Sequence, residues 1–360
     1  MAQKTAMIAM SGGVDSSVAA QLMIDAGYRC VGATMRLLDH AAPEQDHLCK
    51  VLQDIEDAKK VADRLGFPHY VYNFSKEFQE QVVDRFVDCY ECGTTPNPCV
   101  TCNRFIKFGV LLDKGMDELG CDYVVTGHYA RIAQDPDTGR WLLKKATHTA
   151  KDQSYFLYNL TQNQLAHTIF PLGDLTKEEV RAIAEKHGFV NAHKRDSQDV
   201  CFIPSGDYTE FLERYTGKKY PEGDFLDWNG TVVGHHHGAI GYTLGQRKGL
   251  GVAMGEPVYV TSKDMKKNTV TVGRNEDLFS RELLAEDWNW FLFPELTEPV
   301  RVLAKARSRM TEQPATVYPE ADGKARVIFD EPQRAITPGQ AVVLYQGDVV
   351  VGGGTITDAM

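Results

Sequence analysis

The heptapeptide SGGVDSS at residues 11–17 combines residue types that suit a phosphate ligand. The apolar run before it predicts a strand, and the spacing of apolar residues after it predicts a helix. Gly12 and Gly13 let the backbone turn tightly and approach an anion. The N–H groups at the start of the helix and the hydroxyls of Ser16 and Ser17 would donate hydrogen bonds to that anion. A plain turn needs only one glycine, and the GK[ST] ending of a Walker A loop is missing, so the segment predicts a phosphate loop of another kind.

Four cysteines form two closely spaced CxxC pairs, Cys89 with Cys92 and Cys99 with Cys102. Two such pairs are the usual signature of a zinc site. Six residues between the pairs are few for a zinc ribbon, but they do not rule one out. Spacing alone therefore leaves a structural zinc site open beside a catalytic use of these thiols.

The surroundings of Cys102 favour the catalytic use. Asn97 and Pro98 end any preceding helix. Apolar residues then recur at helical intervals, at Phe105, Phe108, Leu112, Met116 and Leu119. Cys102 is therefore predicted in or near the first turn of a helix, with Arg104 and Lys107 close by. A helix N-terminus and nearby cations lower the pKa of a thiol and populate the reactive thiolate, a setting that a buried structural cysteine does not need.

Cys201, in the segment SQDVCFIPSG, is distant in sequence and belongs to no CxxC pair. One interpretation is a small core residue that follows an apolar valine. The other is that Cys201 partners Cys102. Persulfide transfer requires two exchange-competent cysteines, one nucleophilic and one that carries sulfur.

The elements that must position these residues alternate between strands and helices in the first half of the chain. Strands are predicted at residues 5–10, 30–35, 69–73 and 122–126, and helices at 14–26, 55–65 and 176–187. This alternation indicates a parallel sheet covered by helices on both faces. Ligands of such sheets bind at the carboxyl ends of the strands, which is where Ser11, Met35 and Gly127 lie.

The sequence changes character after about residue 207. Glycine becomes frequent through residues 217–255. Short β-type runs follow at residues 257–261, 269–273, 300–306, 315–318, 325–329, 341–345 and 349–356. Many short strands with turn residues between them predict a closed or sandwiched β domain.

Composition is that of a folded protein, with 43% hydrophobic and 24% charged residues in 360. No segment approaches the apolar length of a membrane span, and the apolar part of the N-terminus is too short for a signal peptide, so we expect a cytoplasmic protein without a membrane partner. Eight cysteines then indicate catalysis or metal binding more than disulfides. The net charge of −10 argues against indiscriminate nucleic-acid binding but allows a localised basic footprint.

The loop at residues 11–17 resembles the pyrophosphate loop of the N-type ATP pyrophosphatases, which split ATP between its α and β phosphates and adenylate a substrate. Six ordered segments also closely resemble the tRNA-specific 2-thiouridylase family. They are AMSGGVDSS at residues 9–17, TPNPCVTCNRFIKFG at 95–109, TGHYAR at 126–131, KDQSYFL at 151–157, SQDVCFIPSGDY at 197–208 and GYTLGQRKGLG at 241–251.

The resemblance implies a three-part α/β chain. Residues 1–207 would form the ATP-pyrophosphatase catalytic domain, an adenine-nucleotide alpha-hydrolase-like parallel sheet with helices on both faces. Residues 208–274 would form a small α+β or β linker domain. Residues 275–360 would form a C-terminal β-barrel that contacts tRNA.

The resemblance also implies roles for individual residues. Cys102 would be the nucleophile and Cys201 the persulfide-bearing cysteine, and the two can form a disulfide during turnover. The ATP site would comprise Ala9, Met10, Ser11, Gly12, Gly13, Val14, Asp15, Ser16, Met35 and Gly127. The tRNA substrate would be bound by Asn97, Pro98 and Cys99 around the target base, by Lys151, Asp152 and Gln153, and by Arg307, Ser308 and Arg309.

The implied activity is ATP-dependent 2-thiolation of the wobble uridine of tRNA, with ATP and Mg²⁺ as cofactors. The expected partners are tRNAs with lysine, glutamate and glutamine acceptors, and a persulfide-donating relay protein or cysteine desulfurase. One departure concerns Cys99, because many family members carry Asp there and a thiol is a poorer acid–base group near neutral pH. Whether Cys99 replaces that carboxylate, or joins a metal site, stays open.

A basic run supplies a candidate RNA surface. Arg301, Lys305, Arg307 and Arg309 alternate along one predicted strand and would project from one face, although a solvated strand face explains the same pattern. The three histidines at residues 235–237 cannot all face one ion from a strand and are predicted in a loop or facing RNA.

Two other functions compete with the thiolating enzyme. An adenylating ligase for a small molecule would use the loop but not the cysteines. A zinc-ribbon RNA-binding protein would use the cysteines but not the loop.

Overall fold

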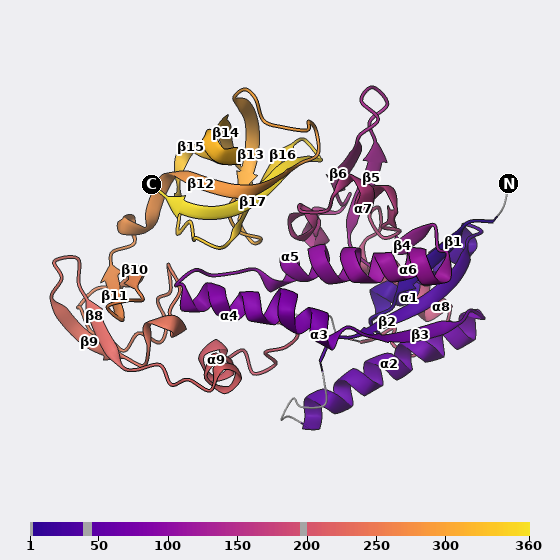
Figure 1. Ribbon diagram of the computed structural model, residues 1–360, viewed down its shortest axis with the longest axis horizontal. Helices are drawn as coiled ribbons and strands as arrows, with labels where there is room; N and C mark the ends of the chain where they lie inside the picture. The colour runs from indigo at the N-terminus through magenta and orange to yellow at the C-terminus, as the bar shows by residue number, and fades with distance from the viewer. Residues whose placement is uncertain (1–2, 39–44, 195–199) are drawn as a thin grey trace. The chain divides into compact units, whose positions relative to one another are not determined.

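The computed structural model describes residues 3–38, 45–194 and 200–360, without the side chains of residues 45–48 and 50 (Figure 1). The chain divides into two compact units. The first comprises Met1–Val83, Cys99–Phe202 and Gln346–Gly352, and the second comprises Asp84–Pro98, Ile203–Tyr345 and Gly353–Met360. Both candidate catalytic cysteines, Cys102 and Cys201, therefore belong to the first unit.

The first unit is built on a five-stranded parallel sheet in the order β3-β2-β1-β4-β7. Its strands are β1 (Thr5–Ala9), β2 (Arg29–Arg36), β3 (His69–Asn73), β4 (Tyr123–Val125) and β7 (Thr168–Ile169). The chain leaves β1 toward β2 on one side and later returns to β4 on the other. The strand order therefore reverses between β1 and β4, and ligands of open α/β sheets bind at such a switch point.

Helices cover both faces of this sheet. Ala6, Ile8 and Met10 share one core cluster with residues of α1 (Val14–Asp25), α2 (Gln45–Leu65) and α8 (Lys177–Lys186). The intervening Met7 faces the other way, because a Cβ added at Gly115 in α6 (Leu111–Leu119) would lie 2.5 Å from its Cε. Alternation along β1 thus gives each face its own helical layer. The predicted α/β sheet with helices on both faces is confirmed.

The helical run that contains Cys102 differs from the prediction in its length and shape. The helical run starts at Pro98 with α5 (Pro98–Cys102), continues as the π-helix η2 (Asn103–Val110) and ends with α6. Cys102 is therefore the fifth and last residue of α5, just past its first turn. The helix predicted at residues 55–65 also begins earlier, at Gln45.

Short elements complete the first unit. The antiparallel hairpin of β5 (Ala130–Gln134) and β6 (Trp141–Lys145) pairs with the start of β17 through Lys144 and Val349. The 3-10 turns η3 (Thr149–Lys151) and η4 (Ser154–Leu157) and the helix α7 (Gln162–Ala166) follow. Near β3 lie α3 (Ser75–Phe78) and the π-helical η1 (Gln79–Val83). Sequence patterns predicted none of these elements.

The second unit contains two α-helices and two β structures. Aromatic rings of α4 (Asp84–Glu91) and α9 (Tyr208–Thr216) pack together, with Tyr90 stacked on Tyr208 at 5.9 Å. A four-stranded sheet follows in the order β10-β11-β8-β9, from β8 (Gly223–Leu226), β9 (Val232–His236), β10 (Tyr259–Asp264) and β11 (Thr269–Gly273). Its core is a small apolar cluster around Phe225 and Val260.

The C-terminal strands close into a barrel. They are β12 (Phe279–Trp290), β13 (Val300–Lys305), β14 (Gln313–Pro319), β15 (Ala325–Arg334), β16 (Ala341–Gln346) and β17 (Val349–Ala359). The order β12-β15-β14-β13-β16-β17 returns to β12, and Glu282 and Met360 exchange both backbone hydrogen bonds. The predicted C-terminal β-barrel is confirmed, although β12, its longest strand, was missed.

Two local predictions in the second unit are wrong. The basic run is not one strand, because β13 ends at Lys305 and Arg307 and Arg309 lie in the following turn. The loop predicted for the histidines is wrong for His235 and His236, while His237 lies just beyond the strand. His235 and His236 are the last two residues of β9, so their side chains point to opposite faces of the sheet. His235 is exposed and hydrogen-bonds to the carboxylate of Asp224, while His236 is buried in the core.

No helix in the described ranges is long and apolar enough to cross a membrane.

Candidate functional site

The loop after β1 lies at the sheet's switch point and is held by its own hydroxyls. The Oγ of Ser16 donates to the carbonyl of Gly13 at 3.0 Å and accepts from the N–H of Ser11 at 3.2 Å. Ser17 Oγ donates to the same carbonyl at 3.1 Å. Gly13 is the N-cap of α1, and no side chain among the described residues caps the first turn. The N–H groups of that turn are therefore available to an anionic ligand.

Two glycines are required at this point by close contacts. Gly12 has a φ of +72°, and a Cβ there would lie 2.2 Å from the carbonyl oxygen of Asp54. At Gly127, after β4, a Cβ would lie 2.8–2.9 Å from backbone atoms of Asp15 and Ser16. The structure thus brings Gly127 against the loop. Met35 lies one strand away, two residues beyond Ala33, which pairs with Ala9.

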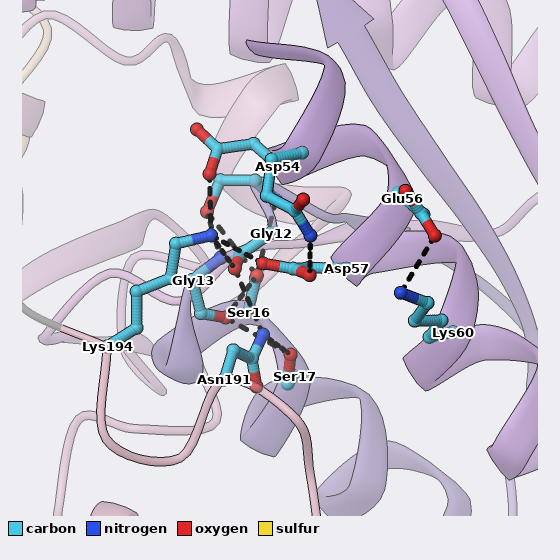
Figure 2. A network of polar contacts seen from close by, with 12 residues as sticks. Gly12, Gly13, Ser16, Ser17, Asp54, Glu56, Asp57, Lys60, Asn191 and Lys194 are labelled. Atoms are coloured by element: carbon cyan, nitrogen blue, oxygen red, sulfur yellow. Dashed lines mark hydrogen bonds and ion pairs between the residues drawn. The ribbon is translucent and has the colours of Figure 1, made fainter. Parts of the chain in front are cut away.

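A second layer of side chains fixes the loop from outside (Figure 2). Asn191 Nδ2 donates to the carbonyl of Gly12 at 3.0 Å and to Ser17 Oγ at 2.9 Å. Lys194 Nζ donates to the same carbonyl at 3.2 Å and pairs with Asp54 at 2.6 Å and Asp57 at 2.7 Å. These contacts tie α2, the loop and the segment after α8 together.

Asp15, a predicted nucleotide-binding residue, is already engaged by protein groups. Its carboxylate receives Lys177 Nζ at 2.7 and 2.9 Å and the hydroxyl of Tyr129 at 2.8 Å. Lys177 is 7% exposed, so the pair is largely withdrawn from water. Asp15 therefore anchors the first turn of α1 to α8 and to the strand region after β4.

Sequence reasoning missed Lys177, Asn191 and Lys194. A weak signal existed for Lys177, which follows Thr176, the N-cap of a capping box with Glu179. Nothing in the sequence of Asn191 or Lys194 links them to a loop about 180 residues earlier, because the link arises from tertiary packing alone.

Three thiols of the first unit, those of Cys99, Cys102 and Cys201, interact electrostatically with one another. Dense packing of protein around its thiol raises the pKa of Cys201 to about 12 although the residue keeps exposed surface, and the negative charges of Cys102 and Cys99 raise the pKa further. The structure thus brings Cys201 within electrostatic range of Cys102 and Cys99, where Lys107 also acts on it. All three are free cysteines.

The predicted low pKa of Cys102 is wrong. Cys102 is 8% exposed, and burial raises the pKa of its thiol, opposed by the positive charge of Lys107. Burial likewise raises the pKa of Cys99 against the same lysine. The helix N-terminus does not lower the pKa of Cys102, because the residue lies beyond the first turn. Desolvation raises this pKa more than the positive charge of Lys107 lowers it.

The other predicted CxxC pair lies in the second unit. Cys89 lies in α4 and Cys92 just beyond its end, in the second unit. Burial raises the pKa of Cys89. Within residues 3–38, 45–194 and 200–360, no group of three or more His, Cys, Asp or Glu side chains could hold a metal ion.

Two of the predicted substrate residues, Asp152 and Gln153, hydrogen-bond to the backbone around them. Asp152 accepts hydrogen bonds from the N–H of Ala146 at 2.9 Å and the hydroxyl of Ser154 at 2.7 Å. Gln153 accepts from the N–H of Tyr129 at 3.0 Å. These two side chains hold the chain in shape, while Lys151 is exposed.

The remaining substrate residues fall in both units. Pro98 begins α5 and Asn97 precedes it, ahead of Cys99. Arg307, half-buried, donates to the hydroxyl of Thr337 and the carbonyl of Leu244, and Arg309 is exposed. Asn97 and Pro98 belong to the second unit, as Arg307 and Arg309 do, while Cys99 belongs to the first.

A glycine-rich phosphate loop at the switch point of a parallel sheet is the arrangement of a nucleotide-binding enzyme of the PP-loop class. Family models match almost the whole chain. They are the tRNA methyl transferase HUP domain at residues 4–205, the tRNA methyl transferase PRC-barrel domain at 209–274 and the aminomethyltransferase β-barrel domain at 280–356.

Close relatives agree with this class. The tRNA-specific 2-thiouridylase MnmA of Acetivibrio thermocellus is 48% identical over 359 residues, 99% of this chain and 100% of the relative. That of Moorella thermoacetica is 51% identical over 352 residues, 97% and 98% of the two chains. The chain belongs to the tRNA-specific 2-thiouridylase family, as the six sequence segments predicted.

A solved structure, a 4-thiouridine synthetase–RNA complex with bound ATP, is 20% identical and covers 59% of this chain and 50% of that chain. The TM-score is 0.37, so this structure is too dissimilar to inform the description of the site.

Proposed function

We propose that this protein thiolates the 2-position of the wobble uridine of tRNA at the expense of ATP. The observation that carries the proposal is that Cys201 lies within electrostatic range of Cys102, in the unit that also holds the phosphate loop. Membership of the 2-thiouridylase family supports the substrate class. The work would take place in the cytoplasm, where tRNA is found.

The first chemical step is adenylation of the base. The 2-oxygen of uridine attacks the α-phosphorus of ATP, an O–P bond forms, and pyrophosphate leaves. The loop supports this step because the N–H groups at the start of α1, which no side chain in the described ranges caps, suit the departing phosphates. The 2-oxygen then leaves as part of AMP, a far better leaving group than oxide.

Sulfur arrives as a persulfide on Cys201. In one route the Cys102 thiolate attacks the Cys201 sulfur, a Cys102–Cys201 disulfide forms and hydrosulfide departs to displace AMP from the base. In the other route the terminal sulfur of the persulfide displaces AMP directly, and Cys102 then attacks the Cys201 sulfur and releases the thiolated base. Either route ends with a disulfide that a thiol reductant must reopen.

The tRNA substrate would be held by the residues that the family resemblance assigns to it. Asn97, Pro98 and Cys99 precede or begin the helix of Cys102 and would surround the target base. Cys99 stands where many relatives carry Asp, and burial raises the pKa of its thiol, so we assign it a contact role more than a proton-transfer role. The segment of Lys151, with Asp152 and Gln153 shaping it, and Arg307, Ser308 and Arg309 would contact tRNA phosphates.

The loop is suited to bind the phosphates of ATP, but its side chains are not suited to hold a magnesium ion by themselves. The described residues hold no metal-binding group of three, and the loop carboxylate, Asp15, already receives Lys177 and Tyr129. A Mg²⁺ ion would therefore enter on the phosphate oxygens of ATP, as is usual for nucleotides.

The test is a transfer assay with labelled sulfur, bulk tRNA, ATP and a persulfide donor, either a relay protein or a cysteine desulfurase. Cys102→Ser and Cys201→Ser are each expected to abolish labelling of tRNA while tRNA binding stays near that of the wild type. Labelled tRNA should be enriched in lysine, glutamate and glutamine acceptors. Turnover that survives Cys201→Ser would end the two-cysteine scheme.

A small-molecule ligase would use the same loop, and pyrophosphate release separates the two functions. We expect release to depend on added tRNA. Release with a metabolite and no tRNA would favour the ligase. A steep fall of tRNA affinity with salt would support the phosphate contacts.

A further inference from the structure

Lys107 lies in an unusual stretch of helix. The segment η2 is π-helical, and its end shows the wide spacing directly, because the N–H of Leu111 bonds to the carbonyl of Ile106, five residues earlier. Gly109 permits the same spacing, since a Cβ there would lie 3.2 Å from the carbonyl oxygen of Arg104. π-Helical turns are rare and occur often at functional sites.

Side chains from outside the helix hold this stretch in place. Gln164 Nε2 donates to the carbonyls of Phe108 at 2.6 Å and Arg104 at 3.4 Å. Asn103 Nδ2 donates to the carbonyl of Phe156 at 2.8 Å. Neighbouring segments therefore fix the π-helical turn, and it is not a chance distortion of a free helix.

The π-helical turn changes which residues lie on the same side of the helix. In an α-helix, residues five apart are about 140° apart around the axis, nearly on opposite sides. In a π-helix the i→i+5 hydrogen bond stacks them one above the other. Cys102 is the N-cap of η2 and Lys107 follows five residues later, so the π turn brings the lysine to the side of Cys102. Cys99 shares that side, three residues before Cys102.

The charges around Lys107 come from three segments. Lys107 interacts electrostatically with Cys99 and Cys102 of α5, with Cys201 and with His128 after β4. Burial, with Lys107, lowers the pKa of His128 well below its usual value, so the imidazole is neutral near pH 7 and accepts or donates with Thr126 at 2.7 Å. In the described parts of the chain, Lys107 has no carboxylate partner that neutralises it.

We propose that Lys107 is the positioning residue of the sulfur-transfer site: the π-helical turn presents its ammonium to the three thiols, where its charge favours the anionic form of sulfur. The proposal rests on the proposed function only in naming the site one of sulfur transfer. Because thiolates repel one another, a single ammonium supports one sulfur anion at a time. Lys107 can then stabilise the thiolate of Cys102 and the sulfur anion on Cys201 one after the other during sulfur transfer.

The experiment measures thiol reactivity in the full-length protein without ATP or tRNA. Iodoacetamide alkylation of Cys102 and Cys201 is followed against pH by peptide mass spectrometry. Lys107→Met is expected to move the Cys102 profile to higher pH, and the alkylation rate near pH 7.5 should fall about tenfold for every pH unit by which the profile moves. Lys107→Arg, which keeps the charge, should restore the profile to within a few-fold of wild type.

A matched control uses Lys114→Met, in the same helical run, because Lys114 pairs with Glu118 and has no thiol partner among the described residues. It should leave both profiles unchanged. Melting curves of all variants identify any that do not fold. The proposal is wrong if folded Lys107→Met alkylates like the wild type, or if Lys107→Arg is as slow as Lys107→Met.

The outcome is separable from that of the proposed function. A displaced alkylation profile together with thiolation that survives Cys201→Ser would keep Lys107 as the charge partner and remove the two-cysteine scheme. An unchanged alkylation profile together with lost thiolation in Cys201→Ser would keep the two-cysteine scheme and remove the role of Lys107.

Discussion

The ammonium of Lys177 lies 2.7 and 2.9 Å from the two carboxylate oxygens of Asp15, and it joins the start of α8 to the phosphate loop. Tyr129 adds a hydrogen bond to the same carboxylate. The pair is structural in this arrangement, because the carboxylate that the loop sequence offers to a ligand is already matched in charge. Loop shape and the integrity of this ion pair should therefore be linked.

Lys177→Met is expected to lower the free energy of unfolding by about 2–3 kcal/mol, because it leaves the Asp15 carboxylate without its cation in a poorly hydrated position. The loss should be smaller than for a fully buried pair, since the Asp15 side chain keeps 30% of its exposure. Urea denaturation followed by tryptophan fluorescence measures it.

Lys60→Met is the matched control. Lys60 forms an ion pair with Glu56 on α2, with both side chains about half exposed. Exposed i,i+4 pairs contribute little, so its removal should leave the urea midpoint unchanged. Equal effects of Lys177→Met and Lys60→Met would contradict the assignment of Lys177 as a buried anchor.

Lys194→Met is expected to weaken ATP binding about tenfold. Its ammonium holds the Gly12 carbonyl and pairs with Asp54 and Asp57, so its loss frees the peptide plane between Gly12 and Gly13 and leaves two carboxylates beside the loop. Those negative charges repel the phosphates of ATP. Isothermal titration with ATP measures the affinity.

Asn191→Leu removes the other donor to the Gly12 carbonyl without adding charge. It should weaken ATP binding less than Lys194→Met does, and the difference should shrink at high salt, where charge repulsion is screened. If both variants bound ATP like the wild type, the carbonyl contacts would have no part in shaping the loop.

Much of the first unit could be predicted because its local signals agree with its packing. The apolar run of β1, the glycine pair at Gly12 and Gly13 and the amphipathic α8 each indicate the same element by propensity and by burial pattern. The hairpin of β5 and β6 has weaker signals, since its strands are half-buried and its residues mix polar with apolar types.

The electrostatics of the site could not be predicted in the same way. Sequence places Lys107 near Cys102, which suggests a lowered thiol pKa, but only tertiary packing decides how much protein surrounds the sulfur. Burial overrides the cation at Cys102 and Cys201. The π-helical turn that presents Lys107 likewise depends on Gln164, a residue more than fifty positions later.

Gly12→Ala is expected to abolish ATP binding. A methyl group at Gly12 would lie 2.2 Å from the Asp54 carbonyl oxygen, so either α2 or the loop must shift, and the positive φ adds strain. The loop would then lose the shape in which its N–H groups converge. Titration with ATP at several temperatures measures the loss.

Gly27→Ala separates strain from contact. Gly27 has a φ of +83°, but none of the described atoms lies within 4 Å of an added Cβ. It should cost about 1–2 kcal/mol of stability, as a left-handed alanine does, and leave ATP affinity unchanged. Loss of ATP binding in Gly27→Ala would show that general destabilisation, not the contact with Asp54, explains Gly12→Ala.

Lys263→Met is expected to stabilise the second unit near neutral pH. Burial lowers the pKa of Lys263 to about 8, below its usual value, while its ammonium lies 6.0 Å from the centre of the Tyr90 ring and donates to the Tyr242 carbonyl. A lysine with a lowered folded-state pKa is penalised in its charged form. The penalty is full below pH 8 and disappears as pH rises toward the unfolded value near 10.5.

The gain from Lys263→Met should therefore be on the order of 1–2 kcal/mol at pH 7, less whatever the hydrogen bond to Tyr242 contributed. It should shrink steadily between pH 8 and 10. Thermal melting at several pH values measures both the size and the trend. A gain that stayed constant across this range would mean that methionine packs better beside Tyr90, and that the charge of Lys263 carries no cost in the folded protein.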